Sequence, residues 1–327
     1  MPSALISAGP LRGEPGPFRT VLTEAGWTCI DTPGVHTLTR DELDRLLPQA
    51  DAILAGGEDI TADLLAQCPK LRVIARAGVG YDAVDVPAAT KQGIAVTIAP
   101  GTNQESVAEH TFALLLAAAR RIADYSRVIH AGGWDRDLVM PVRNRTLGLV
   151  GLGRIGRAVV VRARAFRMKV VAFDPVADPA FDAEFGVERL GLEELLAASD
   201  FVSLHLPISP TTRHLINSRT LALMKPGSIL VNTARGGLVN ELDLRDALVS
   251  GHLAAAALDV LNHEPPEPGN PLLGLRNVVL APHVGGLDSD SMRDMGTAAA
   301  RCIVNLFKGD WPADSVVNPD VKPRFAS

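Results

Sequence analysis

Four parts of the sequence hold residues whose types and spacing could do chemistry. The first is a glycine-rich run, Gly151-Leu152-Gly153-Arg154-Ile155-Gly156. The other three each hold one side chain that can bind an anion or exchange a proton, namely Arg235, Glu264 and His283. A glycine-rich turn can bring backbone amides close to a phosphate. Arginine can clamp a carboxylate, and histidine can act as an acid or a base. The elements around these residues decide whether such chemistry is possible.

The glycine-rich run directly follows a predicted strand, Leu147–Val150, and opens a predicted helix, Ile155–Phe166. Gly151 permits the tight turn, and Gly153 lets the backbone approach a pyrophosphate. Gly156 lets the helix pack against the strand, and the helix N-terminus supplies amide donors and a positive dipole end. Strand, turn and helix together predict a dinucleotide-binding site.

An acidic residue indicates which dinucleotide binds. The next predicted strand, Lys169–Phe173, is followed by Asp174, about 20 residues after Gly153, where a carboxylate binds the adenosine ribose hydroxyls. A carboxylate at this place repels a 2′-phosphate. The following residues, Pro175-Val176-Ala177, contain no arginine to receive that phosphate. The sequence therefore predicts NAD as the cofactor.

The chain alternates short β-branched apolar runs with helical patterns, which is typical of βαβ units and parallel sheets. The first predicted strands are Ala4–Ser7, Trp27–Asp31, Ala52–Leu54, Val73–Arg76 and Ile94–Val96, and the helices between them include Phe18–Ala25, Asp41–Leu47 and Ala62–Gln67. A long apolar helix is expected at residues 102–120, followed by an irregular arm, Tyr125–Arg145.

A second series of predicted strands comprises Leu147–Val150, Val170–Phe173, Phe201–His205, Ile229–Asn232, Ala255–Leu258 and Val278–Leu280. The helices Ile155–Phe166, Leu192–Ala197 and Leu242–Leu248 fit between them, and a last helix spans Ser289–Phe307. Parallel strands with crossover helices match the doubly wound dinucleotide fold. We therefore predict an α/β protein with two doubly wound parallel-sheet domains.

Composition excludes several classes of function. The net charge of −5, from 32 Lys+Arg against 37 Asp+Glu, gives no basic excess for binding nucleic acid. Three scattered cysteines, Cys29, Cys68 and Cys302, predict neither a disulfide framework nor a metal site. The N-terminus shows no secretory signal, and the most apolar run, Phe112–Ala119, is far shorter than the ~20 residues that span a bilayer. We expect a cytoplasmic protein with no membrane or nucleic-acid partner.

Arg235, Glu264 and His283 all follow predicted strands of the second series, and ligands of doubly wound sheets bind at that edge. The segments around them strongly resemble the D-isomer-specific 2-hydroxyacid dehydrogenase family. The resemblance covers nearly the whole chain, most clearly from Leu71 to Gly286. It is carried by Arg76–Asp82, Gly151–Gly156, Asn232–Gly237, Ala257–Pro266 and Ala281–Gly286. It implies hydride transfer between NAD and a small 2-hydroxy acid.

The resemblance implies a role for each candidate side chain. Arg235 would clamp the 2-oxo-acid carboxylate and polarise its carbonyl, and backbone amides of Val79 and Gly80 would hold the same carboxylate. His283 would take the hydroxyl proton as hydride leaves C2, and return it in the reverse direction. Glu264 would hydrogen-bond His283, orient its ring and favour its protonated form. Without the family, Arg235 is a surface arginine at a strand end and Glu264 is a loop charge.

The resemblance also implies the cofactor contacts and the domain organisation. Besides Gly151, Gly153 and Gly156, the expected contacts are Arg154 and Ile155 at the pyrophosphate, Asp174 at the ribose, and Leu206, Thr233, Ala234, Asp259, His283, Gly285 and Gly286 along the nicotinamide half. Residues 1–99 and 288–327 would form a discontinuous, flavodoxin-like substrate domain, and residues 100–287 a Rossmann NAD-binding domain. The long helix and the arm near Trp134 resemble the family's dimerisation region, so a homodimer is expected.

Within the family, the segments look most like those of members that oxidise D-3-phosphoglycerate, an activity of serine biosynthesis. Such members commonly carry a basic or Arg-Ser segment after the third strand, whereas Ala55–Asp59 is neutral and then acidic here. Carboxylates oppose a phosphate, although Arg136 or Arg143 of a partner subunit could compensate. A hydroxypyruvate or glyoxylate reductase is therefore the alternative. The sequence does not distinguish either of these enzymes from a dehydrogenase that acts on an uncommon 2-hydroxy acid.

A remote alternative belongs to another class of protein. Corepressors of the C-terminal-binding-protein type resemble this family in fold and keep the same three residues, so an NAD-sensing corepressor-like protein stays open. Turnover of simple 2-oxo acids would discriminate between the two, since a sensor would bind NADH and convert such acids poorly.

Overall fold

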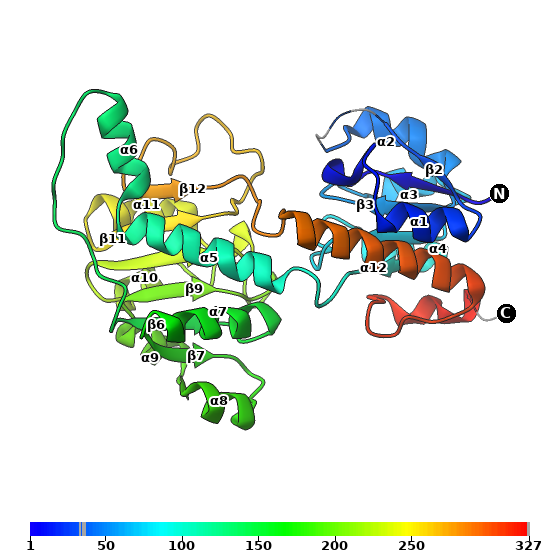
Figure 1. The fold of residues 1–327 in the computed structure, drawn as a ribbon. Helices are drawn as coiled ribbons and strands as arrows, with labels where there is room; N and C mark the ends of the chain where they lie inside the picture. The colour runs from blue at the N-terminus through cyan, green and yellow to red at the C-terminus, as the bar shows by residue number, and fades with distance from the viewer. Residues whose placement is uncertain (33, 35–36, 326–327) are drawn as a thin grey trace. The chain divides into compact units, whose positions relative to one another are not determined.

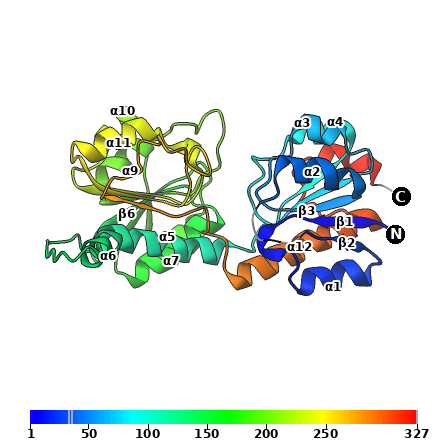
Figure 2. The ribbon, with the colours of Figure 1, turned by 90° about the horizontal axis from the view of Figure 1, so that it is seen from above.

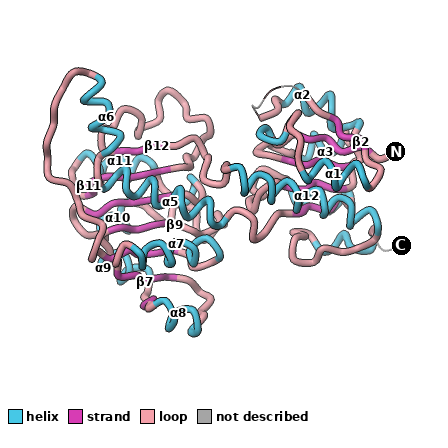
Figure 3. Tube along the Cα trace, viewed as in Figure 1, coloured by secondary structure: helices cyan, strands magenta, loops and turns pink. Residues whose placement is uncertain are grey.

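Two all-parallel sheets organise the structure, one in each of two units of the chain (Figure 1). The computed structural model describes residues 1–32, 34 and 37–325. Unit 1 comprises Met1–Asn103 and Gly286–Ser327, and unit 2 comprises Gln104–Gly285. Strands and helices alternate along the chain in both units (Figure 3). The α/β class predicted from the sequence is therefore confirmed.

The sheet of unit 1 has five strands in the order β2-β1-β3-β4-β5. They are β1 (Ser3–Ile6), β2 (Thr28–Ile30), β3 (Ala52–Ala55), β4 (Val73–Arg76) and β5 (Ala95–Thr97). This is the flavodoxin-like order expected for the first domain. Because the chain leaves β1 for β2 on one side and returns to β3 on the other, the ends of β1 and β3 form a topological switch point.

Helices cover both faces of this sheet. They are α1 (Pro17–Glu24), α2 (Arg40–Leu46), α3 (Ala62–Ala66), α4 (Val86–Gln92) and α12 (Ser289–Lys308), with 3-10 turns at Gly9–Leu11, Leu47–Gln49 and Pro319–Arg324. Strand side chains alternate between the faces. Ile6 therefore packs in a cluster with residues of α1 and α12, whereas its neighbour Leu5 packs in a cluster with residues of α2, α3 and α4. Figure 2 shows these two groups of helices on opposite sides of the sheet.

The end of the chain completes unit 1 at the edge of its sheet. Val316 forms an antiparallel bridge with Thr97 of β5. The buried Asn318 accepts a hydrogen bond from the N–H of Val96 at 2.8 Å and donates one to the carbonyl of Ile94 at 2.9 Å. These contacts satisfy polar groups that an edge strand would otherwise expose. They explain why the last segment of the chain belongs to the same unit as the first.

The sheet of unit 2 has seven strands in the order β12-β11-β10-β9-β6-β7-β8. They are β6 (Thr146–Val150), β7 (Lys169–Phe173), β8 (Val187–Arg189), β9 (Phe201–Leu204), β10 (Ser228–Asn232), β11 (Leu253–Leu258) and β12 (Val278–Leu280). The first six in chain order follow the Rossmann pattern, and β12 extends it. The sequence predicted six strands and missed β8. This short edge strand has one apolar residue, Val187, followed by Glu188 and Arg189, so it carries no apolar run.

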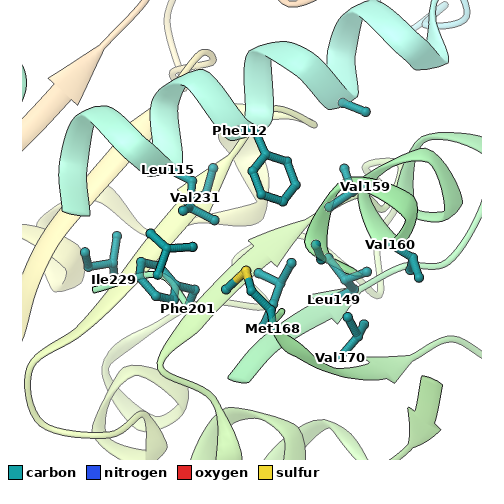
Figure 4. Packing of buried hydrophobic residues seen from close by; sticks show 14 of the residues in the cluster. Phe112, Leu115, Leu149, Val159, Val160, Met168, Val170, Phe201, Ile229 and Val231 are labelled. Carbon is teal, nitrogen blue, oxygen red and sulfur yellow. The ribbon is translucent and has the colours of Figure 1, made fainter. Parts of the chain in front are cut away.

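Helices cover both faces of this sheet as well (Figure 2). One face of the sheet carries α5 (Gln104–Ala119) and α7 (Arg154–Ala165). The other face carries α9 (Leu192–Ala198), α10 (Ser218–Leu223) and α11 (Glu241–Val249). The short helix α8 (Pro179–Phe185) precedes β8 in the chain. Phe112 and Leu115 of α5 join Val159 of α7 in a buried cluster with Met168 and Phe201 (Figure 4). This cluster fixes α7, and with it the glycine-rich turn, against the sheet.

Part of the segment predicted to be an irregular arm is helical. Arg121 adopts a left-handed conformation with a φ of 54°, which separates α5 from a second helix, α6 (Ile122–His130). Asp124 in its first turn is buried and pairs with Arg121 at 2.6 Å and with Arg276 at 2.9 Å. An acid at this position stabilises a helix N-terminus. The prediction of irregular chain was therefore wrong for residues 125–130 and holds for the turns and loop at 131–145.

Among the described residues, no helix combines the length and the apolar character that crossing a membrane requires.

Candidate active site

The glycine-rich turn of unit 2 joins β6 to α7. Gly151 has a φ of 104°, a left-handed region that favours glycine, and a Cβ there would lie 2.6 Å from the carbonyl oxygen of His205. A Cβ at Gly156 would lie 2.5 Å from the carbonyl oxygen of Gly151. Backbone therefore occupies the space of a side chain at both positions. The predicted reasons for these two glycines, a tight turn and close helix packing, match what the structure shows.

Gly153 is different, because it faces open space. It is the N-cap of α7, and a Cβ there would meet no atom of the described residues within 4 Å. The first turn of α7 continues with the exposed Arg154, the half-buried Ile155 and Arg157. A helix N-terminus with exposed amides, a positive dipole end and neighbouring arginines fits an anion. The residues present therefore fit the pyrophosphate of a dinucleotide.

Asp174 lies beside this turn at the end of β7. Its Oδ2 accepts a hydrogen bond from the N–H of Leu152 at 2.7 Å, and its Oδ1 accepts one from the N–H of Val176 at 2.8 Å. A carboxylate oxygen can accept more than one hydrogen bond. The half-buried carboxylate is thus held by two amides and retains acceptor capacity for ribose hydroxyls. The sequence placed this acid next to the turn, and the structure brings the two together.

His205 supports the turn from the end of β9. Its N–H donates to the carbonyl of Val150 at 2.8 Å, and its Nε2 is 2.9 Å from the hydroxyl of Ser203. Desolvation lowers the pKa of His205 to about 4, so its ring is neutral near pH 7. The next residue, Leu206, lies close to Gly151, since a Cβ at Gly151 would be 3.1 Å from its Cδ2.

The segment after β10 presents the predicted arginine. The buried Asn232 accepts the N–H of Ala234 at 3.0 Å and donates to the carbonyl of Arg235 at 2.8 Å, which shapes the turn. The Thr233 hydroxyl is 2.9 Å from that of Thr111 in α5. The half-buried Arg235 donates from Nη1 to the carbonyl of Ala234 at 2.6 Å and begins a 3-10 turn, η3 (Gly236–Leu238).

His283 and Glu264 form a direct pair at the end of the same sheet. His283 Nδ1 lies 2.7 Å from Glu264 Oε2, and Glu264 Oε1 accepts the N–H of Leu261 at 3.0 Å. Both carboxylate oxygens are therefore used to fix the glutamate and the ring. The His283 side chain is 50% exposed, so its other ring nitrogen, Nε2, is the one available to a bound molecule.

Asp259 anchors the loop that carries His283. Its backbone carbonyl accepts the N–H of His283 at 2.8 Å, and its carboxylate accepts the N–H groups of Val284 at 2.9 Å and Gly285 at 2.8 Å. His110 of α5 adds a contact of 3.1 Å through Nε2. Burial raises the pKa of Asp259, but the hydrogen bonds from His110, Val284 and Gly285 outweigh it and hold the pKa below its ordinary value.

Val79 and Gly80 belong to unit 1, in the loop after β4. Arg76 donates from Nε to the carbonyl of Gly80 at 3.0 Å and from Nη1 to the carbonyl of Gly56. The carbonyl of Gly78 accepts the N–H of Ala99 at 2.9 Å. The backbone carbonyls of Gly78 and Gly80, on either side of Val79, are therefore both held by hydrogen bonds. Gly286, also in unit 1, begins the segment that leads to α12.

The structure therefore joins Asp174 to the glycine-rich turn, Glu264 to His283, and Asp259 to the His283 loop. Sequence reasoning gave His110 no role in the site and left Asn232 out of it, although both support it. Nothing in the pattern of α5 distinguishes His110 from a core histidine, because its partner Asp259 lies 149 residues away. Among the described residues, no group of three or more His, Cys, Asp or Glu side chains could hold a metal ion.

Comparison with known proteins shows which family this chain resembles. Residues 112–285 match the family model of the D-isomer specific 2-hydroxyacid dehydrogenase NAD binding domain. A D-3-phosphoglycerate dehydrogenase of Mycobacterium leprae is 44% identical over 293 residues, covering 87% of this chain and 55% of that protein. The chain thus spans just over half the length of that relative. A glyoxylate reductase of Korarchaeum cryptofilum is 43% identical over 273 residues, covering 82% of each chain.

Solved structures agree with this fold. A D-lactate dehydrogenase from Aquifex aeolicus, complexed with NAD and lactic acid, superposes with a TM-score of 0.82 at 29% identity. The match covers 97% of this chain and 99% of that one.

Proposed function

Because the chain belongs to the D-isomer specific 2-hydroxyacid dehydrogenase family, we propose that it transfers a hydride between NAD and a small D-2-hydroxy acid. The observation that carries the proposal is the His283–Glu264 pair, with 2.7 Å between Nδ1 and Oε2. His283 lies on a loop anchored by Asp259, and both residues of the pair belong to the unit that matches the NAD-binding domain.

His283 acts as the acid and base. Because Nδ1 donates to Glu264, the opposite nitrogen, Nε2, takes the proton of the substrate hydroxyl and returns it in the reverse reaction. Glu264 cannot turn away from the ring easily, since its other oxygen accepts the N–H of Leu261. The carboxylate fixes the tautomer and stabilises the positive charge that the ring gains.

NAD, when bound, supplies the acceptor or donor of the hydride. In unit 2, the turn at Gly151, Gly153 and Gly156 receives the pyrophosphate with Arg154 and Ile155, and Asp174 receives the ribose hydroxyls. The proposed contacts of the nicotinamide half are Leu206, Thr233, Ala234, Asp259, His283, Gly285 and Gly286. The open space at Gly153 and the amide-held carboxylate of Asp174 support this assignment.

Arg235 binds the substrate carboxylate and polarises the carbonyl next to it. We assign the amides of Val79 and Gly80 to the same carboxylate. Residues 1–99 and 288–327 then act as the substrate domain, and residues 100–287 as the NAD-binding domain. The exposed Trp134 and Leu138, 77% and 102% exposed, support a homodimer through α6 and the arm at 131–145. Light scattering of the protein in solution tests the dimer.

Two substrates are the leading candidates. D-3-phosphoglycerate is supported by the 44% identity to a D-3-phosphoglycerate dehydrogenase. Hydroxypyruvate or glyoxylate is supported by the glyoxylate reductase relative, which matches over 82% of both chains, and by the acidic loop after β3. Substrate measurements on this chain decide between them.

The test measures NADH consumption with phosphohydroxypyruvate, hydroxypyruvate and glyoxylate, each offered alone. We expect turnover with at least one of them at roughly 1–1,000 per second. The variant His283→Asn should lose about 100-fold or more in kcat while NADH affinity stays within about twofold, because it lacks the acid and base but keeps the cofactor site. NADH binding without turnover of any acid would instead support the sensor, and full activity of the variant would refute the role of His283.

A further inference from the structure

His110 connects the carboxylate of Asp259 to a helix of unit 2. The carboxylate accepts the N–H of Val284 at 2.9 Å through Oδ1 and that of Gly285 at 2.8 Å through Oδ2. Both amides belong to the loop that the carboxylate has to hold. Nε2 of His110, 3.1 Å from Oδ1, comes instead from α5. Among the described residues, His110 is therefore the one side chain that ties this carboxylate to an element other than its own strand end and the His283 loop.

The hydrogen of this contact lies on the histidine. Burial raises the pKa of Asp259, but hydrogen bonds, with that from His110 foremost, outweigh burial and hold the pKa below its ordinary value. The carboxylate is therefore ionised near pH 7, and an ionised carboxylate only accepts hydrogen bonds. Nε2 of His110 must then carry a hydrogen and donate it. A side chain with no donor at this place would take one hydrogen bond from a buried anion, which costs free energy.

The same face of α5 also holds Gly285 directly. A Cβ at Gly285 would lie 2.9 Å from Oδ2 of Asp259 and 3.5 Å from Cδ2 of His110, so the carboxylate and the imidazole pack against this glycine. Ser106, one helical turn before His110, donates its hydroxyl to the carbonyl of Gly285 at 2.8 Å. The helix thus holds the loop at two points, directly through Ser106 and through Asp259 by way of His110.

Packing fixes α5 itself against the sheet of unit 2. Phe112 of this helix is buried in the cluster that α5 shares with α7 and the strands (Figure 4). The helix also contacts the segment before Arg235, where the hydroxyl of Thr111 lies 2.9 Å from that of Thr233. It therefore contacts both segments that carry the side chains proposed for substrate binding and proton transfer, Arg235 and His283.

We propose that His110 is a positioning residue for the proton transfer, because it donates from Nε2 to Asp259 and so fixes the carboxylate that holds the His283 loop. This inference rests on the proposed function and adds to it a residue that acts through Asp259. Without the donor, the carboxylate can rotate about its Cβ–Cγ bond together with the amides that it binds. The ring of His283 then spends less time in the direction that the reaction requires, which lowers the rate of the chemical step.

The first experiment measures steady-state turnover with NADH and whichever of phosphohydroxypyruvate, hydroxypyruvate and glyoxylate the wild type converts best. His110→Leu removes the donor. It should lower kcat about tenfold or more, the worth of one hydrogen bond to a charged group. The KM of the acid should stay within about threefold, because His110 does not contact the segment of Arg235. His110→Gln keeps an amide N–H near the position of Nε2 and should restore kcat to within about threefold of the wild type.

His252 provides the matched control. It is a second half-buried histidine of unit 2, and its Nε2 donates to the carbonyl of Leu221 at 3.0 Å. His252→Leu therefore removes the same kind of hydrogen bond at the start of β11, the opposite end of that strand from Asp259. It should leave kcat within about twofold of the wild type.

The second experiment needs no turnover. Amide hydrogen exchange of a peptide covering residues 281–287 should be faster in His110→Leu than in the wild type, His110→Gln or His252→Leu. A loss of kcat in His110→Leu without faster exchange would overturn the inference, since the loop would then not be what His110 holds. Equal losses of kcat in His110→Leu and His110→Gln would overturn it as well, because the donor would then not be the group that matters.

The remaining outcomes separate this inference from the proposed function. Wild-type kcat and exchange in His110→Leu overturn the inference and leave the proposed function intact. A wild type that converts no 2-oxo acid refutes the proposed function, and the role of His110 in proton transfer falls with it. Melting curves show whether His110→Leu folds. If it does not, His110→Asn replaces it, because its amide is too short to reach Asp259 and the same losses are expected.

Discussion

Replacing Asp259 by asparagine perturbs the anchor of the His283 loop with almost no change in side-chain volume. The carboxylate of Asp259 accepts hydrogen bonds from the N–H groups of Val284 and Gly285 at 2.9 and 2.8 Å and contacts His110 at 3.1 Å. An asparagine oxygen in place of Oδ1 keeps the contacts to Val284 and His110. Its NH2 group then faces the N–H of Gly285, donor against donor.

The magnitude follows from these contacts. A hydrogen bond to a charged group contributes about 1.5–3 kcal/mol, and a neutral one about 1 kcal/mol less. Asp259→Asn loses one such bond and weakens two, while the burial cost of the charge disappears. We therefore expect the free energy of unfolding of unit 2 to fall by about 2–4 kcal/mol. The loop should also open more often, so the turnover number should fall, because His283 is attached to the same anchor through its own N–H.

Three measurements test this expectation. Urea unfolding followed by circular dichroism gives the loss of stability. Amide hydrogen exchange of a peptide covering residues 281–287 gives the local opening, which should be faster in the variant. Steady-state NADH oxidation gives the turnover number. The matched control is Asp246→Asn, the same change at an exposed acid of unit 2, which should alter each quantity little. A variant with wild-type stability and exchange would refute the anchoring role.

The effect has a defined dependence on pH. The pKa of Asp259 lies below its ordinary value in the folded protein, so its contribution to stability is present above the unfolded pKa of about 4. That contribution is lost as pH falls through the folded pKa, where the carboxylate is protonated in both states. The stability difference between wild type and Asp259→Asn should thus be constant from about pH 7 to 5 and shrink below about pH 4. A difference that grows on acidification would show that the charged form is not the stabilising one.

Three further predictions concern the cofactor site. Gly153→Ala should fold like the wild type, because its Cβ meets no described atom within 4 Å, yet weaken NADH binding about tenfold or more by filling the pyrophosphate space. Gly156→Ala should lower the melting temperature, because its Cβ would lie 2.5 Å from the carbonyl oxygen of Gly151. Equal melting curves and equal NADH titrations for the two variants would contradict the different roles assigned to Gly153 and Gly156. Asp174→Ala should weaken the binding of NAD and narrow the preference for NAD over NADP. An unchanged ratio of the NAD and NADP dissociation constants would show that another residue selects the cofactor.

The sequence could predict where the glycine-rich turn lies and that Asp174 lies beside it, because these positions depend on neighbours in the chain or on an adjacent strand. Gly156 packs against the turn itself, and Gly151 packs against His205 at the end of the adjacent strand β9. Asp174 contacts Leu152 from β7, the neighbouring strand on the other side. The order of βαβ units fixes such contacts once the strands are recognised. The same logic predicted the five strands of unit 1 and six of the seven in unit 2.

What the sequence alone did not provide depends on contacts between distant segments. Glu264 and His283 are 19 residues apart, and only the family resemblance placed them together. His110 reaches Asp259 from α5, and the two residues are 149 positions apart in the chain, so no local pattern reveals the contact. The burial of Glu58 was equally hidden, because an acidic loop after a strand is usually solvated. The assignments of Val79, Gly80 and the nicotinamide contacts stay predictions.

The conformation of His283 shows why a distant anchor is needed at this site. His283 has a φ of 55°, which costs a non-glycine residue about 1–3 kcal/mol unless its surroundings hold it. Asp259 binds three consecutive amides, those of His283, Val284 and Gly285. The end of β11, and not the local sequence, therefore sets the direction in which the ring leaves the backbone. Glu264 then fixes its rotation. A chain that kept His283 and Glu264 but lacked the hydrogen-bond acceptors of Asp259 would carry the same pair of side chains without the contacts that set the direction of the histidine ring.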